Sequence, residues 1–267
     1  MARKRQSSTT HDQDQNPSFD PAKAFGPRQR ADLLLIARGL FESRAQAQAA
    51  IEAGCVIADG NIVTRASDTL PLDAVIEAQA AHPWVSRGGI KLSHALEEYG
   101  ADVAGHICLD VGASTGGFSQ VLLARNAAKI YAVDVGRDQL HPKLRNLPGL
   151  VSIEETDIRS LNANALDPKP DFVVIDASFI SLHHILPAAL ALAARPCILL
   201  ALIKPQFEVA RADLKKGIVR DETLRGQVCA AIESRVADLG GSAIRLFPSP
   251  IAGGDGNIEF FIGARFI

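Results

Sequence analysis

Two lysines and two acids stand at positions where the fold could bring them together for proton transfer: Lys91, Asp176, Lys204 and Glu259. Asp176 and Lys204 each follow an apolar run, and the carboxyl ends of parallel strands form the edge where open α/β sheets bind ligands. Glu259 lies near the start of the last expected strand, which begins at that edge if the strand is antiparallel. Lys91 lies on an expected helix just before the sheet and could fold over the same edge.

A glycine-rich loop connects an expected strand to an expected helix: Asp110-Val-Gly-Ala-Ser-Thr-Gly-Gly-Phe118. Glycine lets the backbone turn and approach a ligand closely. The spacing is GxxxGG rather than the GxGxxG of dinucleotide-binding loops, and the carboxylate of Asp110 would repel a pyrophosphate. It suits a ligand with a positively charged amino-acid end, such as S-adenosyl-L-methionine. The loop residues expected to contact this cofactor are Asp110, Gly112, Ala113, Ser114, Thr115, Gly116 and Phe118.

Further acids follow the next strands in the chain. Asp134 ends the second expected strand, where a carboxylate can accept hydrogen bonds from both ribose hydroxyls. Asp157 follows the third strand, where an adenine amino group would lie, and Asp176 is expected to contact the cofactor as well as Lys204. One such acid would be weak support, because Asp often caps turns. Asp110, Asp134 and Asp157 at successive strand ends, together with the loop, predict the cofactor.

With a methyl donor in place, the four charged residues favour transfer to a ribose 2′-hydroxyl. A lysine can remove the hydroxyl proton if its pKa falls from about 10.4 toward about 7–8. Lys91 would lower the pKa of Lys204, whereas Asp176 and Glu259 would raise it and aim the side chain. Ordinary surface ion pairs are the alternative. That alternative stays open for Lys91, but Lys204 follows an apolar strand directly.

Two other methyl acceptors fit the sequence less well. Methylation of a base carbon would need a nucleophilic cysteine at this edge, and Cys197 starts its strand at the far edge. An enzyme that methylates nitrogen usually carries Asn/Asp-Pro-Pro-aromatic after the fourth strand, and here the sequence is Asp176-Ala-Ser-Phe179.

Alternating elements position these residues and predict an α/β fold with a parallel, doubly wound, Rossmann-like sheet. Strands are expected at 107–111, 129–135, 151–154, 172–176, 197–203, 242–247 and 257–266, and helices at 90–99, 118–125, 184–194 and 222–239. No helix separates the last two strands, which favours an antiparallel final pair. The catalytic domain is therefore expected to occupy residues 90–267.

The region before residue 90 divides into three parts. Residues 1–27 are polar and predict a disordered tail, in which Arg3-Lys4-Arg5 either contacts phosphates or is simply solvated. Residues 28–82 predict a small α+β domain with helices near 33–40 and 44–51, the second capped by Ser43, and strands near 56–63 and 74–78. Residues 83–89 predict a linker, where Trp84 couples the domains or only packs between them.

Composition bounds the remaining properties. The net charge is −2, so any surface that binds nucleic acid must be local. The four cysteines have no zinc-ligand spacing, which predicts no metal site and a reduced, cytoplasmic protein. No signal peptide is recognisable, and no apolar run reaches the roughly 20 residues that span a bilayer. We expect a monomer or weak dimer that does not enter a membrane.

Together these motifs resemble the TlyA, or hemolysin A, family. The resemblance rests on residues 85–92, 110–118, 174–181, 204–208 and 256–261, and residues 28–82 resemble the RNA-binding domain named after ribosomal protein S four. It implies an FtsJ-like, class I 2′-O-methyltransferase acting on cytidine in ribosomal RNA of one or both ribosomal subunits. It further implies that Lys204 is the base, that Asp176 and Glu259 orient it, and that Lys91 supports the target nucleotide.

The RNA-binding residues are the least determined part. Residues 28–65 hold five arginines against four acids, for a net charge of only +1. The candidate RNA contacts are Arg28, Arg30, Arg38, Arg44 and Arg87. Solvated helix charges are the alternative for Arg38 and Arg44. Two other functions stay open: a membrane-active hemolysin, which the lack of a strongly amphipathic cationic segment disfavours, and a ribosome-binding factor without catalysis, which the four charged residues disfavour.

Overall fold

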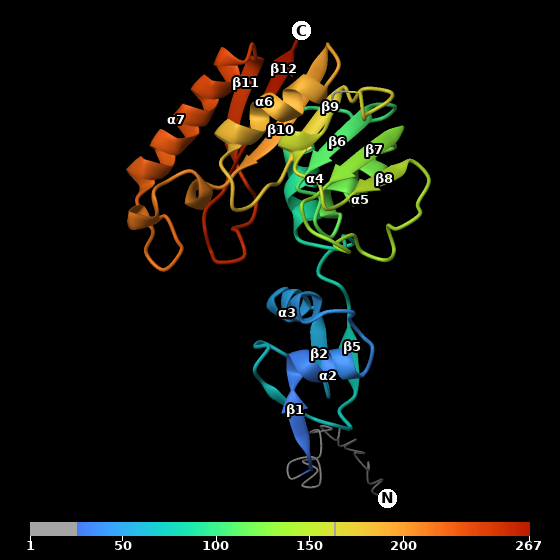
Figure 1. The fold of residues 1–267 in the computed structure, drawn as a ribbon. Helices are drawn as coiled ribbons and strands as arrows, with labels where there is room; N and C mark the ends of the chain where they lie inside the picture. Colours follow the sequence, from blue (N-terminus) through green and yellow to red (C-terminus); the bar gives the residue numbers. More distant parts are fainter. Residues whose placement is uncertain (1–25, 163) are drawn as a thin grey trace, which may run out of the picture. The chain divides into compact units, whose positions relative to one another are not determined.

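The computed structural model describes residues 26–162 and 164–267, and the chain separates into two compact units, Met1–Ala81 and His82–Ile267 (Figure 1). The tail predicted at 1–27 lies outside the described residues except for Gly26 and Pro27, and so does Arg3-Lys4-Arg5.

A seven-stranded sheet forms the centre of the second unit, with the strand order β11-β12-β10-β9-β6-β7-β8. The bounds are β6 Ile107–Val111, β7 Lys129–Val133, β8 Leu150–Ile153, β9 Phe172–Ile175, β10 Cys197–Ile203, β11 Ser242–Pro248 and β12 Phe260–Phe266. The five strands from β8 to β10 are parallel, while β12 runs antiparallel to both β10 and β11. The predicted Rossmann-like sheet with an antiparallel end is confirmed.

The strand order reverses between β6 and β9. From β6 the chain adds β7 and β8 on one side, and then returns to add β9 and β10 on the other. The carboxyl ends of β6 and β9 therefore flank a topological switch point, where a doubly wound sheet binds its ligand. The glycine loop follows β6 and Asp176 follows β9, so the two predicted site segments meet at this point.

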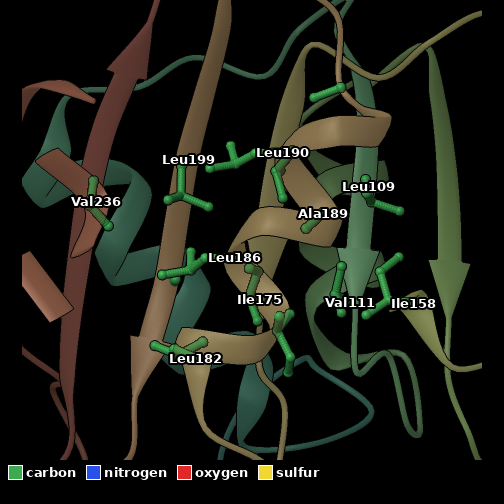
Figure 2. Close-up of a cluster of buried hydrophobic side chains, with 14 of the residues drawn as sticks. Leu109, Val111, Ile158, Ile175, Leu182, Leu186, Ala189, Leu190, Leu199 and Val236 are labelled. Carbon is green, nitrogen blue, oxygen red and sulfur yellow. The ribbon is translucent and has the colours of Figure 1, made fainter. Parts of the chain in front are cut away.

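Helices cover both faces of this sheet, which explains why its strands are apolar throughout. The helices are α4 Gly88–Tyr99, α5 Gly117–Ala124, α6 Leu182–Leu192 and α7 Glu222–Asp238. Alternate residues of β10 enter different clusters: Leu199 packs with α6 and α7, whereas Leu200 packs with α4 and α5. Figure 2 shows Leu186 and Leu190 of α6 directed at the strands. Truncating the fully buried Leu186 to Ala would cost about 2–5 kcal/mol.

The first unit is small and has its own core. It contains α2 Ala31–Ala37, α3 Arg44–Glu52, a sheet of β3 Asn61–Ile62, β2 Val56–Ala58 and β5 Ile76–Ala78, and a separate pair of β1 Arg28–Arg30 with β4 Thr69–Pro71. Ser43 caps α3 by accepting from the backbone N–H of Gln46, as predicted. The hydrophobic core of the first unit includes Leu35, Ile51 and Val56. The pair β1–β4 was not expected, because three-residue strands leave no periodic pattern.

Two element boundaries differ from expectation near the site. The last strand begins at Phe260, not at residue 257, because Asn257 turns its side chain into hydrogen bonds with Gly217 and Val219 instead of entering the sheet. Glu259 therefore lies just before β12. Helix α4 begins at Gly88, and the preceding residues pack with the second unit: the backbone N–H of Val85 donates to Gln120 Oε1 over 2.6 Å.

Candidate active site

The glycine loop passes close to the end of the neighbouring strand. Gly112 has φ +82°, and a Cβ at this position would lie 2.8 Å from the carbonyl oxygen of Asp176. Only glycine allows both the left-handed backbone and this approach. Gly116, just before α5, has φ +88°, and a Cβ there would meet the side chains of Leu144 and Leu140. The glycines are thus required for a close passage of backbone at the switch point.

Two cavities adjoin at this loop. The larger one, of about 410 Å³, extends over the ends of β6, β7 and β9, and the smaller one, of about 200 Å³, lies between the loop and Lys204. Gly112, Ser114, Asp176 and Ser178 line both. A combined space of this size is typical of a site for a nucleoside-sized ligand.

Most residues predicted to bind the cofactor line these cavities. Asp134 and Asp157 line the larger one, Ala113, Thr115 and Phe118 line the smaller one, and Gly112, Ser114 and Asp176 line both. Gly116 lines neither cavity, and the adjacent Gly117 takes its place in the smaller one.

Asp110 also lies outside the cavity walls. It is fully buried beneath the loop, where Ser119 Oγ donates to Asp110 Oδ2 over 2.7 Å. Its other oxygen, Oδ1, is buried without a hydrogen-bond partner among the described residues. Burial raises the pKa of Asp110 to about 7, and the charges of Asp176 and Asp134 add to this, while the hydrogen bond from Ser119 opposes it. A direct contact between Asp110 and the cofactor stays a prediction.

Asp134 and Asp157 are held by backbone donors. Asp134 accepts from the N–H of Ser114 and of Gly136, each over 2.7 Å, which ties the glycine loop to the end of β7. Asp157 accepts from the side chain and backbone N–H of Arg159, and these hydrogen bonds lower the pKa of its carboxyl to about 2. Both side chains are therefore fixed carboxylates at the wall of the larger cavity.

The four charged residues form two ion pairs. Lys204 Nζ lies 2.7 Å from Asp176 Oδ1 and donates to Ser178 Oγ over 2.9 Å. Lys91 Nζ lies 2.5 Å from Glu259 Oε2. Counted over the whole residue, Lys91, Lys204 and Glu259 are at most 8% exposed. The pair of Lys204 with Asp176 faces the smaller cavity, whereas Lys91 and Glu259 are not part of its wall.

The two pairs are connected through Gln206, which lies two residues after Lys204. Its Nε2 donates a long hydrogen bond of 3.5 Å to Glu259 Oε1. The structure therefore brings Lys204 and Asp176 into direct contact, whereas Glu259 contacts Gln206, which is joined to Lys204 only along the backbone. Ser178 and Gln206 were not predicted as site residues. Ser178 lies in the quoted Asp176-Ala-Ser-Phe179 stretch, and a polar residue two positions after Asp176 was the available signal.

An exposed aromatic stands at the rim of the larger cavity. Phe179 is 90% exposed, has φ +65° and lies with its ring centroid 5.0 Å from that of Phe207. Positive φ is strained for a residue of this size. The backbone therefore holds an apolar ring in solvent next to Ser178, which burial alone does not explain.

The arginines of the first unit are engaged within it. Asp32 is completely buried and receives hydrogen bonds from Arg30 and Arg44, and the bond from Arg30 is the largest cause that holds its pKa well below the usual range. Arg38 donates to the carbonyl oxygens of Ala74 and Leu72.

The other two candidate RNA contacts are placed differently. Arg28 donates to Thr69 within the first unit, and Arg87 is the residue before α4 in the second. Arg30 and Arg44 keep about half of their side chains exposed, so they remain available to a phosphate, whereas the guanidinium of Arg38 supports the fold.

Two family profiles match this chain. The FtsJ-like methyltransferase profile covers residues 84–266, and the S4 domain profile covers residues 29–76. The chain is 44% identical over 243 residues to the 16S/23S rRNA (cytidine-2′-O)-methyltransferase TlyA of Mycobacterium tuberculosis, which covers 89% of this chain and 90% of that protein.

The chain belongs to the TlyA family of FtsJ-like methyltransferases. It is 41% identical over 240 residues to Hemolysin A of Brachyspira hyodysenteriae, with 89% of this chain and 99% of the relative covered. A putative hemolysin from Streptococcus thermophilus has a similar structure, with a TM-score of 0.71, 37% identity, and coverage of 90% of this chain and 89% of that one. The predicted family and fold are confirmed, and the chain is a methyltransferase.

Two further questions for the part of the chain that the structure describes are whether a helix could span a membrane and whether side chains could hold a metal ion. No helix within residues 26–162 and 164–267 is long and apolar enough to cross a membrane. In the same part of the chain, no group of three or more His, Cys, Asp or Glu side chains could hold a metal ion.

Proposed function

We propose that this chain transfers a methyl group from S-adenosyl-L-methionine to the 2′-hydroxyl of cytidine in ribosomal RNA. The observation that carries the proposal is the buried Lys204, which lines the smaller cavity and is held by Asp176 and Ser178, two residues that line both cavities. The names of the relatives and the S4 domain support ribosomal RNA as the acceptor. A ribosomal substrate requires the reaction to take place in the cytoplasm, as the sequence predicts.

The residues at the switch point fit this cofactor. Asp134 would hold the ribose hydroxyls and Asp157 would face the adenine amino group, since both carboxylates are fixed at the larger cavity. The amino-acid end of the cofactor would lie in the smaller cavity beside Gly112 and Thr115. The loop can pass this close to Asp176 only because Gly112 has no Cβ. When bound, the cofactor supplies an electrophilic methyl group on a sulfonium.

Lys204 would act as the general base. Its Nζ would accept the proton of the 2′-hydroxyl as that oxygen is methylated, and the bound cofactor would supply the methyl group. A positioned base of this kind contributes about 10²–10⁴-fold to the rate. Asp176 and Ser178 hold Nζ in place, and they would stabilise the ammonium that the proton transfer creates.

Glu259 and Lys91 would act indirectly. Glu259 touches Gln206 rather than Lys204, so it orients the segment that carries the base. Lys91 neutralises Glu259 in a buried position. We propose that this pair fixes the frame around Lys204 and that Phe179 offers its exposed ring to the target base, because bases that leave a stack are commonly received on aromatic side chains.

The decisive experiment maps ribose methylation on ribosomal RNA from cells with and without this protein. We expect one or a few cytidines to lose their 2′-O-methyl group in the deletion strain, and to regain it with the wild-type chain but not with Lys204→Ala. Identical methylation maps in the two strains would refute the acceptor assignment. Full restoration by Lys204→Ala would refute the role of the base.

A further inference from the structure

The segment between β10 and α7 carries a local basic charge that the cofactor site does not use. Residues 209–220 hold four basic residues against one acid, Asp213, for a formal charge of +3, and the whole segment 204–221 has +2, in a chain whose net charge is −2. The basic residues are all exposed, and no ion pair within residues 26–162 and 164–267 engages them. They are Arg211, Lys215, Lys216 and Arg220.

Two of these lysines form the tip of a tight hairpin. The backbone N–H groups of Lys215 and Ile218 donate to each other's carbonyl oxygens over 3.0 and 3.2 Å. Lys216 and Gly217 between them have φ +54° and +81°, which is the left-handed pair of a two-residue hairpin turn. Asn, Asp or Gly is favoured at the first of these positions, whereas a lysine there is strained. The local backbone therefore does not explain why Lys216 stands at the tip.

A buried amide anchors this hairpin beside the active site. Asn257 is 1% exposed, donates from Nδ2 to the carbonyl of Gly217 over 2.9 Å, and accepts at Oδ1 from the N–H of Val219 over 3.0 Å. Figure 1 shows the segment before α7 next to the loop between β11 and β12 at one end of the sheet. Both the Nδ2 and the Oδ1 of the buried Asn257 are hydrogen-bonded to the hairpin segment, so the hairpin cannot move without breaking two hydrogen bonds.

The anchor is two residues from Glu259, or at most about 7 Å along the backbone. Glu259 contacts Gln206, which lies two residues after Lys204. The hairpin is thus connected to the base through the hydrogen bonds of Asn257 and Gln206 and two short stretches of backbone, 257–259 and 204–206. A basic tip in a fixed relation to a catalytic lysine suits a polyanion whose one ribose must enter the site.

We propose that the 215–218 hairpin binds phosphates of the RNA strand beside the reacting ribose, and that Asn257 is the positioning residue that fixes the hairpin relative to Lys204. This rests on the proposed function. Exposed lysines contact phosphates as point charges, independently of sequence, so the hairpin contributes register and affinity rather than choice of base.

The test removes the two charges without altering the turn. Lys216→Asn keeps a residue that tolerates positive φ, and Lys215→Gln keeps the length of the side chain. Binding of the full chain to ribosomal RNA, extracted from cells that lack the protein, is measured from 50 to 200 mM salt. The slope of log K against log salt is negative, and each lost phosphate contact reduces its magnitude by about 0.7–0.9. For the double variant, the loss of affinity over this range should therefore be about 7- to 12-fold smaller than for the wild type.

Lys169→Gln is the matched control. Lys169 lies in the Pro-Lys-Pro segment just before β9, at the opposite edge of the sheet, and is also exposed. The control should leave the salt slope unchanged, whereas Lys216→Asn alone should reduce the magnitude of the slope by the amount expected for about one phosphate contact. A double variant with the wild-type slope, or a control with the same effect as Lys216→Asn, would overturn the hairpin as a phosphate site.

Asn257→Ala tests the anchor. We expect a higher KM for RNA and a lower salt slope, with the dissociation constant of the cofactor unchanged. Added to the double variant, Asn257→Ala should cause no further loss in RNA affinity, since its effect passes through the same lysines. Additive losses would overturn the positioning role. If Asn257→Ala fails to fold, Asn257→Asp replaces it, because an aspartate keeps the acceptor and loses only the donor to Gly217.

The wild-type chain separates this proposal from the proposed function. Methyl transfer by the wild type together with an unchanged slope in the double variant removes the hairpin and keeps the enzyme assignment. A reduced slope without methyl transfer by the wild type keeps the hairpin and removes the assignment. A wild type that does not bind this RNA overturns both.

Discussion

Removing one partner of the pair formed by Lys91 and Glu259 should destabilise the methyltransferase unit more than removing both. The side chains of Lys91 and Glu259 are 9% and 2% exposed, and their charged atoms are 2.5 Å apart. Glu259→Gln leaves an ammonium without its counter-charge in a site with little solvent. Lys91→Met leaves a buried carboxylate whose one other donor, among the residues that the structure describes, is the long contact from Gln206. The double variant leaves no unpaired charge.

The expected magnitudes follow from burial. Breaking a buried ion pair on one side costs about 3–5 kcal/mol, whereas replacing both partners is often nearly neutral. For a unit of about 150–250 residues, each kcal/mol shifts Tm by about 2–4 °C. Each single variant should therefore melt about 6–20 °C below the wild type, and the double variant should recover most of that loss. Two independent sites would instead give additive shifts.

Thermal unfolding and methyl transfer to unmodified ribosomal RNA should be measured on all four proteins. If the pair only supports the fold, the double variant regains activity together with its Tm. If the pair also frames the base through Gln206, the double variant regains its Tm but keeps a lowered rate constant. Single variants that melt with the wild type would refute the reasoning, because the pair would then be hydrated and its charges would need no partners.

Four further substitutions test the glycine loop, the buried Asp110, the proposed base Lys204, and Phe179 at the rim of the larger cavity. Gly112→Ala should abolish cofactor binding, since its Cβ would meet the backbone of Asp176 at 2.8 Å, while Gly105→Ala, with a similar φ of +76° and open space, should cost only about 1–2 kcal/mol in a thermal melt. Asp110→Asn should gain stability relative to the wild type as pH rises from about 4 to 7 and no more above that: the folded pKa is raised to about 7, so the unfolded chain loses its proton first and the wild type loses stability across this window. Melting curves with a pH-independent difference would contradict this. Lys204→Ala should slow methyl transfer by about 10²–10⁴-fold with cofactor affinity retained, as calorimetry and single-turnover rates would show. Phe179→Ala should lower kcat/KM for RNA by about 5- to 150-fold if the ring stacks on a base, at roughly 1–3 kcal/mol per base, and an unchanged value would remove it from the acceptor site.

The sequence was most informative where one interaction dominates the local structure. The bounds of β10 agree with prediction at both ends because a run of seven apolar residues is buried on both faces of the sheet. The glycine loop was recognisable because Gly112 has a conformation and a close contact that no other residue allows. The start of α3 followed from the cap at Ser43.

The sequence was least informative about which charges pair. Lys91, Asp176, Lys204 and Glu259 were expected to converge, but partner choice depends on side-chain directions at distant positions, which no spacing encodes. Asp110 shows the same limit. Its position before the loop predicts contact with a ligand, which stays a prediction, but that position gave no sign of the hydrogen bond that it accepts from Ser119.

The arginines of the RNA-binding unit illustrate a further limit. Arg30, Arg38 and Arg44 were all candidates for phosphate contacts, because the sequence does not distinguish an arginine that faces solvent from one whose guanidinium is engaged within the unit. In the structure, Arg38 satisfies backbone carbonyls, and Asp32 holds the other two. The carboxylate of Asp32 cancels one positive charge and holds the guanidinium groups of Arg30 and Arg44 in place. The unit therefore has a lower net charge but two arginines in defined positions.

A difference in access decides which of the two ion pairs can exchange a proton with a substrate. Both lysines are almost fully buried, and each has its own carboxylate, so neither leaves an unpaired charge inside the unit. Of the four charged residues, Lys204 and Asp176 line the smaller of the two cavities at the glycine loop, and Lys91 and Glu259 line neither of the two. A hydroxyl group in the smaller cavity would therefore lie next to Lys204. We expect proton transfer to involve Lys204 rather than Lys91, because Lys91 is paired with Glu259 and does not line that cavity.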